Sequence, residues 1–227
     1  TDTGSFIRAA CVVQPPKLIL VVLVDTLRAD CLAGMGSQRT ITPNIDRLAS
    51  HGVVFKDAYS NSNWTKPAVA ALFTGLWPSE TGALAMYLRR EDDTEIETLL
   101  SPNVETLAIR LSEAGYRTGG FVNNPHLDQQ FGFARGFDVY EQAPESCDRI
   151  VDNCLEWLEN APQRPAFAYL HFLEPHAPYQ PIARYRDIFG QHKSADAFFP
   201  CESGTYEDWV LMRDSINSGC LLYTSDA

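Results

Sequence analysis

Runs of apolar residues along the chain predict strands that alternate with helices. Residues 17–25 form a continuous aliphatic run without polar alternation, which is typical of a strand buried on both faces at the centre of a parallel sheet. Apolar residues at intervals of three and four predict helices. The predicted strands cover residues 17–25, 53–57, 117–122 and 166–172, and the predicted helices lie near residues 43–51, 66–74, 103–114 and 145–160. This alternation predicts an α/β fold with a mostly parallel central sheet.

Capping residues support several of these helix boundaries. Thr42 is an expected N-cap, and Pro43 suits the first helical position because proline lacks the N–H that would be unsatisfied there. Gly75 and Gly115 follow two further predicted helices, and glycine is the usual residue just after a helix end.

Polar residues with metal-binding or proton-transfer chemistry follow two of the predicted strands. Asp25 ends the first strand, and ligands of open α/β sheets bind beyond the carboxyl ends of the strands, where a carboxylate suits a hard cation. The strand 166–172 contains His171 and leads into a proline-rich loop with His176. The alternatives are a turn residue for Asp25 and a hydrogen-bonded core histidine for His171.

A hydroxyl residue, Thr65, stands directly before an alanine-rich helix. Backbone N–H groups and the helix dipole favour negative charge at that position, so a nucleophile there can meet an anionic ester. The alternative is that Thr65 is an ordinary N-cap.

Six segments that carry these residues occur in a characteristic order. They are the strand ending in Asp25, Thr42–Ala49, Phe55–Ser60, the helix closing in Leu72–Gly75, the pair Gly132–Phe133 with Gly136–Asp138, and Pro175–Pro178. Over about residues 17 to 190 the chain resembles the sulfatase branch of the alkaline phosphatase superfamily. The resemblance implies an alkaline-phosphatase-like three-layer sandwich with a mostly parallel central sheet.

The resemblance also implies roles for individual residues. Asp25 resembles the first metal ligand, Thr65 the nucleophile that also binds metal, and His176 the histidine on the substrate anion or the leaving group. Asn63 and Lys66 flank the nucleophile and are expected to contact the anion, as is His171 if it has a site role.

One further position is assigned by resemblance to the sulfate-binding lysine of sulfatases. That region holds Asn123 and Asn124, and we favour Asn124 as the substrate-binding residue.

The nucleophile motif departs from that of sulfatases, which have Cys or Ser there, followed by x-Pro-Ser-Arg. This chain keeps Pro67 but has Thr65, Ala68 and Val69. Threonine is not converted to formylglycine, so the motif resembles the phosphoryl branch of the superfamily, which includes phosphodiesterases and phosphoethanolamine or phosphoglycerol transferases. A divalent ion (Ca, Mg, Mn or Zn) would lower the pKa of the threonine hydroxyl, and His176 would protonate the leaving group. The function expected is hydrolysis or transfer of phosphoric or sulfuric esters; the alternative is a relative that binds but does not cleave.

The second half of the family's metal site, an Asp-His pair, has no clear match. Residues 1–16 are expected to be an N-terminal extension and residues 17–219 an incomplete catalytic domain, so we expect the chain as given to be inactive. Residues 220–227 can be encoded by a string that contains the mosaic end of a sequencing adapter, and we expect them to be adapter-derived. The alternative is that Asp226 belongs to a divergent metal motif.

Charge and length narrow the possible partners. A net charge of −11 over 227 residues disfavours nucleic acid, although a bound cation still permits an anionic substrate. The run Leu18–Val24 is too short to span a bilayer. The partner expected is a small-molecule, glycan or lipid ester, and the family resemblance implies a periplasmic or extracytoplasmic location.

Overall fold

The chain divides into two compact units that are described separately. The computed structural model describes residues 16–36, 42–84, 87–89, 95–143, 147–161 and 163–176. Unit 1 comprises residues 1–23 and 60–170, and unit 2 comprises residues 24–59 and 171–227. No helix within the described ranges is long and apolar enough to cross a membrane.

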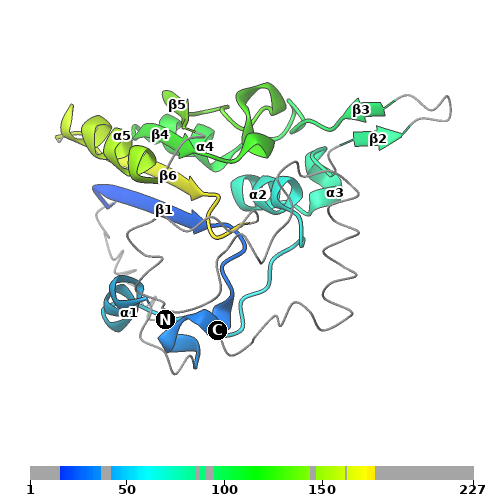
Figure 1. Ribbon diagram of the computed structural model, residues 1–227. Helices are drawn as coiled ribbons and strands as arrows, with labels where there is room; N and C mark the ends of the chain where they lie inside the picture. Colours follow the sequence, from blue (N-terminus) through cyan, green and yellow to red (C-terminus); the bar gives the residue numbers. More distant parts are fainter. Residues whose placement is uncertain are drawn as a thin grey trace, which may run out of the picture. The chain divides into compact units, whose positions relative to one another are not determined.

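A four-stranded parallel sheet organises the fold. Its strands lie in the order β1 (Leu18–Val24), β6 (Ala166–Phe172), β4 (Arg117–Val122) and β5 (Val139–Gln142), with β1 beside β6 in Figure 1. The starts of neighbouring strands are joined by bonds from Ala166 N–H to Lys17 C=O and from Arg117 N–H to Pro165 C=O, both 2.9 Å. β4 and β5 also pair in parallel. The predicted α/β fold with a parallel sheet is therefore confirmed.

Helices pack on both faces of this sheet. On one face, Phe73 of α2 (Thr65–Thr74) meets Tyr169 of β6 edge-on, with ring centroids 4.8 Å apart. Tyr169 and Val122 belong to the same buried cluster. Because side chains alternate along a strand, Phe121 points to the other face, where its ring lies 5.9 Å from Trp157 of α5 (Cys147–Glu159). The helix α4 (Leu107–Glu113) also packs against β4.

Two glycines in β4 allow side chains of α5 and β5 to pack closely against this strand. A Cβ atom on Gly119 would lie 3.1 Å from the Trp157 ring, and one on Gly120 would lie 2.6 Å from the Tyr140 ring. These positions therefore need a residue without a side chain.

The strand β1 differs from its prediction as a central strand buried on both faces. It is the last strand of the sheet among those described, and Leu18, Leu20 and Val22 are about half exposed. The alternate residues Ile19, Val21 and Leu23 pack on the core. Apolar residues on both faces of a strand predict that both faces are buried. Within the described residues, only the face with Ile19, Val21 and Leu23 is covered.

Short elements complete unit 1. They are α3 (Pro78–Thr81), the antiparallel pair β2 (Tyr87–Arg89) and β3 (Glu95–Glu97), and the 3-10 turns η3 (Pro125–Leu127) and η4 (Gln129–Phe131).

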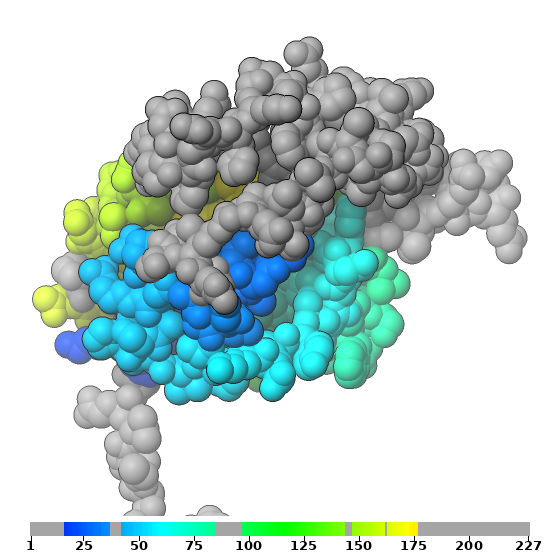
Figure 2. Space-filling model, turned by 60° about the horizontal axis from the view of Figure 1, so that its bottom comes forward, coloured from blue at the N-terminus to red at the C-terminus, as the bar shows by residue number. Residues whose placement is uncertain are grey.

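Unit 2 contains one of the predicted helices but not its predicted strand. The helix α1 (Pro43–Ser50) begins with proline after Thr42, as predicted, and the turns η1 (Ala29–Cys31) and η2 (Ala33–Met35) precede it. Residues 53–57 form no strand, and Phe55 is 78% exposed. The prediction was wrong because a short strand is stable only with a partner, and no described strand pairs with this segment. On the face shown in Figure 2, the segment 42–59 (light blue to cyan) lies at the surface.

Candidate active site

Thr65 is the first residue of α2 rather than its cap. The N-cap is Trp64, in an extended conformation and without a side-chain capping bond, and its carbonyl accepts the N–H of Ala68 at 3.1 Å. The structure therefore excludes the alternative in which Thr65 is the N-cap. The first turn of a helix carries N–H groups outside the helical hydrogen-bond ladder, and the macrodipole makes it electropositive. Thr65, half-buried, thus stands where an anion is favoured.

Lys66, the next residue, points into unit 1. Its side chain has no exposed surface, and its Nζ donates to the Thr98 carbonyl at 3.3 Å and lies 3.7 Å above the centre of the Phe131 ring. Burial lowers the pKa of Lys66, and the charge of Glu97 partly offsets this shift. The amine therefore ties the first turn of α2 to the segment after β3 and to η4.

The loop after β4 also lies against the start of α2. Asn124 is buried, and its side-chain oxygen accepts the N–H of His126 at 2.9 Å, which caps η3. The ring of His126 packs on Trp64, with centroids 5.3 Å apart. The structure thereby brings the predicted substrate residue Asn124 into the same part of unit 1 as Thr65.

Two further polar residues lie near these elements. Asn123 is buried, and its side-chain amide approaches the Cys147 sulfur at 3.9 Å. Asn63 is exposed in the turn before α2, where the Trp64 N–H donates to the hydroxyl of Ser62 at 3.2 Å.

Asp25 and His171 form a pair in unit 2. The backbone N–H of Asp25 continues the β1–β6 ladder by donating to the Phe172 carbonyl at 2.9 Å. This fixes the Asp25 carboxylate 3.3 Å from Nε2 of His171. The Asp25 side chain is 13% exposed and that of His171 is fully buried. His171 is therefore a partner of the predicted metal ligand, and this contact was not expected from the sequence.

The backbone bends sharply after Asp25. Thr26 has φ of 55°, the one residue other than glycine with positive φ among those described. A β-branched residue in this left-handed region is a genuine outlier, and such outliers concentrate at functional sites.

His176 lies beyond β6 in unit 2 and is half-buried. Its backbone N–H donates to the Leu173 carbonyl at 2.9 Å. Asp25, His171 and His176 thus belong to unit 2, whereas Thr65, Lys66 and Asn124 belong to unit 1.

A hard cation needs about six oxygen ligands, and the Asp25 carboxylate lies directly beyond β1, at the strand end where ligands of such sheets bind. Within the described part of the chain, no group of three or more His, Cys, Asp or Glu side chains is arranged to hold a metal ion.

The sequence matches the family described as Sulfatase over residues 17–214. The chain belongs to the sulfatase family. A Delta 4,5-hexuronate-2-O-sulfatase of Bacteroides thetaiotaomicron is 28% identical over 178 residues, which are 74% of this chain and 36% of that protein. An N-acetylgalactosamine-6-O-sulfatase of the same organism is 34% identical over 155 residues, 60% of this chain and 28% of that protein. The chain therefore spans about a third of the length of these relatives.

Solved structures show the same fold. The phosphonate monoester hydrolase of Agrobacterium radiobacter has a TM-score of 0.59 at 23% identity, with coverage of 75% of this chain and 43% of that chain. The alkaline-phosphatase-like fold expected from the sequence is confirmed by this likeness and by the parallel sheet.

Proposed function

We propose that the whole protein hydrolyses or transfers sulfuric or phosphoric esters, with the Thr65 hydroxyl as nucleophile. The observation that supports this most is the position of Thr65 as the first residue of α2 in a chain of the sulfatase family. An anionic ester at this helix end is stabilised by the dipole while it faces a hydroxyl.

We assign Asp25 as a ligand of a divalent ion, with Thr65 as a second one. His171 holds the Asp25 carboxylate in position, as outer-shell partners of metal ligands do. When bound, a divalent ion lowers the pKa of a coordinated hydroxyl and neutralises charge on the ester oxygens. Asp25 and Thr65 are the two ligands that this proposal assigns among the described residues.

The other polar residues have supporting roles in this proposal. His176 donates a proton to the departing alcohol, and Asn63 and Asn124 donate hydrogen bonds to the ester oxygens. Lys66 acts through α2, because its amine is bonded to Thr98 inside unit 1.

Of these two classes of substrate, the proposal expects phosphoric esters to be cleaved better than sulfuric esters. Sulfate chemistry in this family uses formylglycine made from Cys or Ser, and this chain has Thr65 there and Val69 in place of the arginine. The curated relatives named above are sulfatases of sugar units, so a glycan ester is a fitting carrier for the group.

Rates on aryl phosphate, aryl phosphodiester and aryl sulfate with one common leaving group test the proposal on the whole protein. We expect the phosphoric esters to be cleaved faster, and a preference for sulfate would contradict the choice of substrate. No turnover of any ester, with retained binding of an ester, would instead identify a non-catalytic relative.

A further inference from the structure

Trp64, the residue directly before the proposed nucleophile, is a large aromatic residue that is 41% exposed. Its backbone is held on both sides, because its N–H donates to the Ser62 hydroxyl at 3.2 Å and its carbonyl accepts the Ala68 N–H at 3.1 Å. Trp64 is also the immediate neighbour of Thr65, where the proposed function puts the ester. Nothing in the proposed function accounts for its ring.

The loop after β4 holds one side of the Trp64 ring. The His126 ring packs on it, with centroids 5.3 Å apart and planes tilted by 43°. The turn η3, which carries His126, contacts α2 and is itself fixed. The Asn124 side chain accepts the His126 N–H at 2.9 Å, and the Tyr140 hydroxyl donates to the Leu127 carbonyl at 2.6 Å. The ring therefore lies between the start of α2 and the loop that carries Asn124, two parts of unit 1 that the proposed function assigns to the ester.

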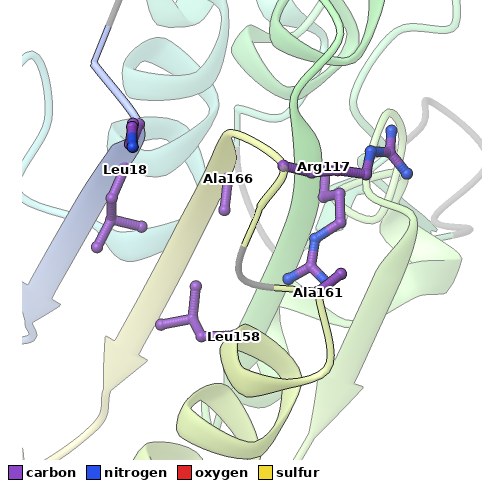
Figure 3. A pocket seen from close by; sticks show the side chains of 7 residues that line it. Leu18, Arg117, Leu158, Ala161 and Ala166 are labelled. Carbon is purple, nitrogen blue, oxygen red and sulfur yellow. The ribbon is translucent and has the colours of Figure 1, made fainter.

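Trp157 of α5 shows how a tryptophan with a packing role is surrounded in this unit. Its ring meets that of Phe121 at 5.9 Å, and the guanidinium of Arg117 lies 4.4 Å from its centre. Arg117 extends from β4 toward Ala161, beyond the end of α5, as Figure 3 shows. Within the described part of unit 1, the Trp64 ring has one such neighbour, His126, and much of Trp64 faces solvent. Packing therefore explains less of Trp64 than of Trp157.

The chemistry of an indole ring indicates which part of a substrate it binds. The face of an aromatic ring carries partial negative charge, so it does not attract the ester anion. It suits the carrier of the ester, if the carrier has a flat apolar face whose hydrogens point at the ring. A sugar ring has such a C–H face, and the proposed function already includes a glycan as carrier. A small alkyl carrier has too little surface for this contact.

We propose that Trp64 is a specificity-determining residue, whose indole face stacks on the C–H face of the sugar ring that carries the ester. The inference rests on the proposed function, because it takes the start of α2 as the position of the ester group. A preformed aromatic surface binds a rigid ring at a small cost in conformational entropy, which favours a sugar over a flexible chain. Since the sugar contacts Trp64 both before and during the reaction, the contact should lower KM and leave kcat nearly unchanged.

Binding of paired esters to the whole protein tests this inference. Calorimetric titration compares the glucose monophosphates with ethyl phosphate, which has the same anionic group on a small carrier. We expect at least one glucose phosphate to bind about three- to tenfold more tightly than ethyl phosphate, the range that aromatic contacts contribute. Trp64→Ala should remove this advantage and leave the affinity for ethyl phosphate unchanged. In steady-state turnover, the same variant should raise KM for the sugar ester by the same factor.

Further variants separate stacking from packing. Trp64→Phe keeps a flat ring and should retain part of the advantage of the sugar ester, whereas Trp64→Leu keeps apolar volume without a ring and should lose it. Both fill part of the space of the indole, so they remain informative if Trp64→Ala fails to fold. Trp77→Ala is the matched control, because Trp77 is 67% exposed and lies beyond the other end of α2. An unchanged ratio of the two affinities in Trp64→Leu, or an equal loss for both esters, would overturn the inference, as would equal affinities in the wild type.

The titrations also keep this inference separate from the proposed function, because they need no turnover. A preference for the sugar ester that depends on Trp64, without cleavage of any ester, would support the inference and contradict the role of Thr65 as nucleophile. Cleavage with a preference that does not depend on Trp64 would overturn the inference alone.

Phosphocholine is the last probe, since an indole face also attracts quaternary ammonium groups. We expect it to bind less tightly than the best glucose phosphate. If it binds more tightly than every glucose phosphate and Trp64→Ala removes that difference, a cationic carrier replaces the sugar and the inference is overturned.

Discussion

At the scale of single residues, the neighbours Thr65 and Lys66 differ sharply in surroundings. Thr65 opens α2 at its electropositive end, while the Lys66 amine is enclosed between the Thr98 carbonyl and the Phe131 ring. The sequence predicts Thr65 as the nucleophile and Lys66 as a contact of the anion, because spacing alone does not show which way the side chains of two adjacent residues point. Only the fold shows that the Lys66 side chain turns inward.

Thr65→Ala should abolish turnover in the whole protein without unfolding it. Loss of a nucleophile costs several orders of magnitude in rate, whereas a helix-end hydroxyl contributes only about 1 kcal/mol to stability. Steady-state rates and the melting temperature of the variant check this. Thr65→Ser should keep part of the activity because it keeps the hydroxyl, and Ser62→Ala, in the turn before α2, should be nearly as active as the wild type. Near-normal rates for Thr65→Ala would exclude the nucleophile role.

Lys66 should make the protein more stable as the pH rises. Its folded pKa is lowered by burial, so between the folded pKa and the unfolded value the unfolded chain binds one more proton than the folded chain. The free energy of unfolding therefore increases with pH across this window. Urea denaturation at a series of pH values up to about 10.4, the unfolded pKa of lysine, should show a smaller increase in Lys66→Met than in the wild type. The exposed-site control Lys56→Met should keep the wild-type slope, and an unchanged slope in Lys66→Met would contradict the inward position of the amine.

At the scale of elements, long apolar patterns were predicted well. Features that depend on a contact with a distant part of the chain were not. The strands 17–25, 117–122 and 166–172 and the helix at Thr65 agree with β1, β4, β6 and α2 within about a residue. The strand at 53–57 is absent, because a strand depends on a partner that local sequence does not specify. The pair of Asp25 and His171 was missed for a related reason: 146 residues separate them, and only the register of β1 beside β6 brings them together.

Gly120→Ala should destabilise unit 1. The added Cβ would lie 2.6 Å from the Tyr140 ring, which is held by a 2.6 Å hydrogen bond from its hydroxyl to the Leu127 carbonyl and cannot swing away freely. Overpacking of this kind costs about 1–3 kcal/mol. Urea denaturation measures the loss. Gly34→Ala is the control, because a Cβ there meets nothing within 4 Å and the residue has ordinary φ. Equal stability of the two variants would show that β4 and β5 tolerate a wider spacing.

At the scale of the whole molecule, the family match says more about the expected metal cofactor than the described residues do. The family match covers residues 17–214, and it identifies the ester-hydrolase superfamily with a divalent ion as its typical cofactor. The described residues supply Asp25 with its partner His171, and no described group of three acidic, His or Cys side chains completes a metal site. Sequence motifs predict Asp25 as the first ligand because it ends a strand, and that role stays a prediction.

The 227-residue chain should therefore bind divalent metal ions only weakly. A hard ion needs about six oxygen ligands, and Asp25 and Thr65, the two ligands proposed among the described residues, leave most of its coordination sphere to water. Calorimetric titration with Mg²⁺, Mn²⁺, Ca²⁺ and Zn²⁺ measures this, with Asp25→Ala as the test variant and Asp57→Ala, which removes an exposed carboxylate of unit 2, as its control. We expect dissociation constants weaker than about micromolar and little difference between the two variants. Micromolar binding that is lost in Asp25→Ala and kept in Asp57→Ala would instead show a metal centre completed by residues of this chain outside the described ranges, and Asp226 would be the first of them to replace.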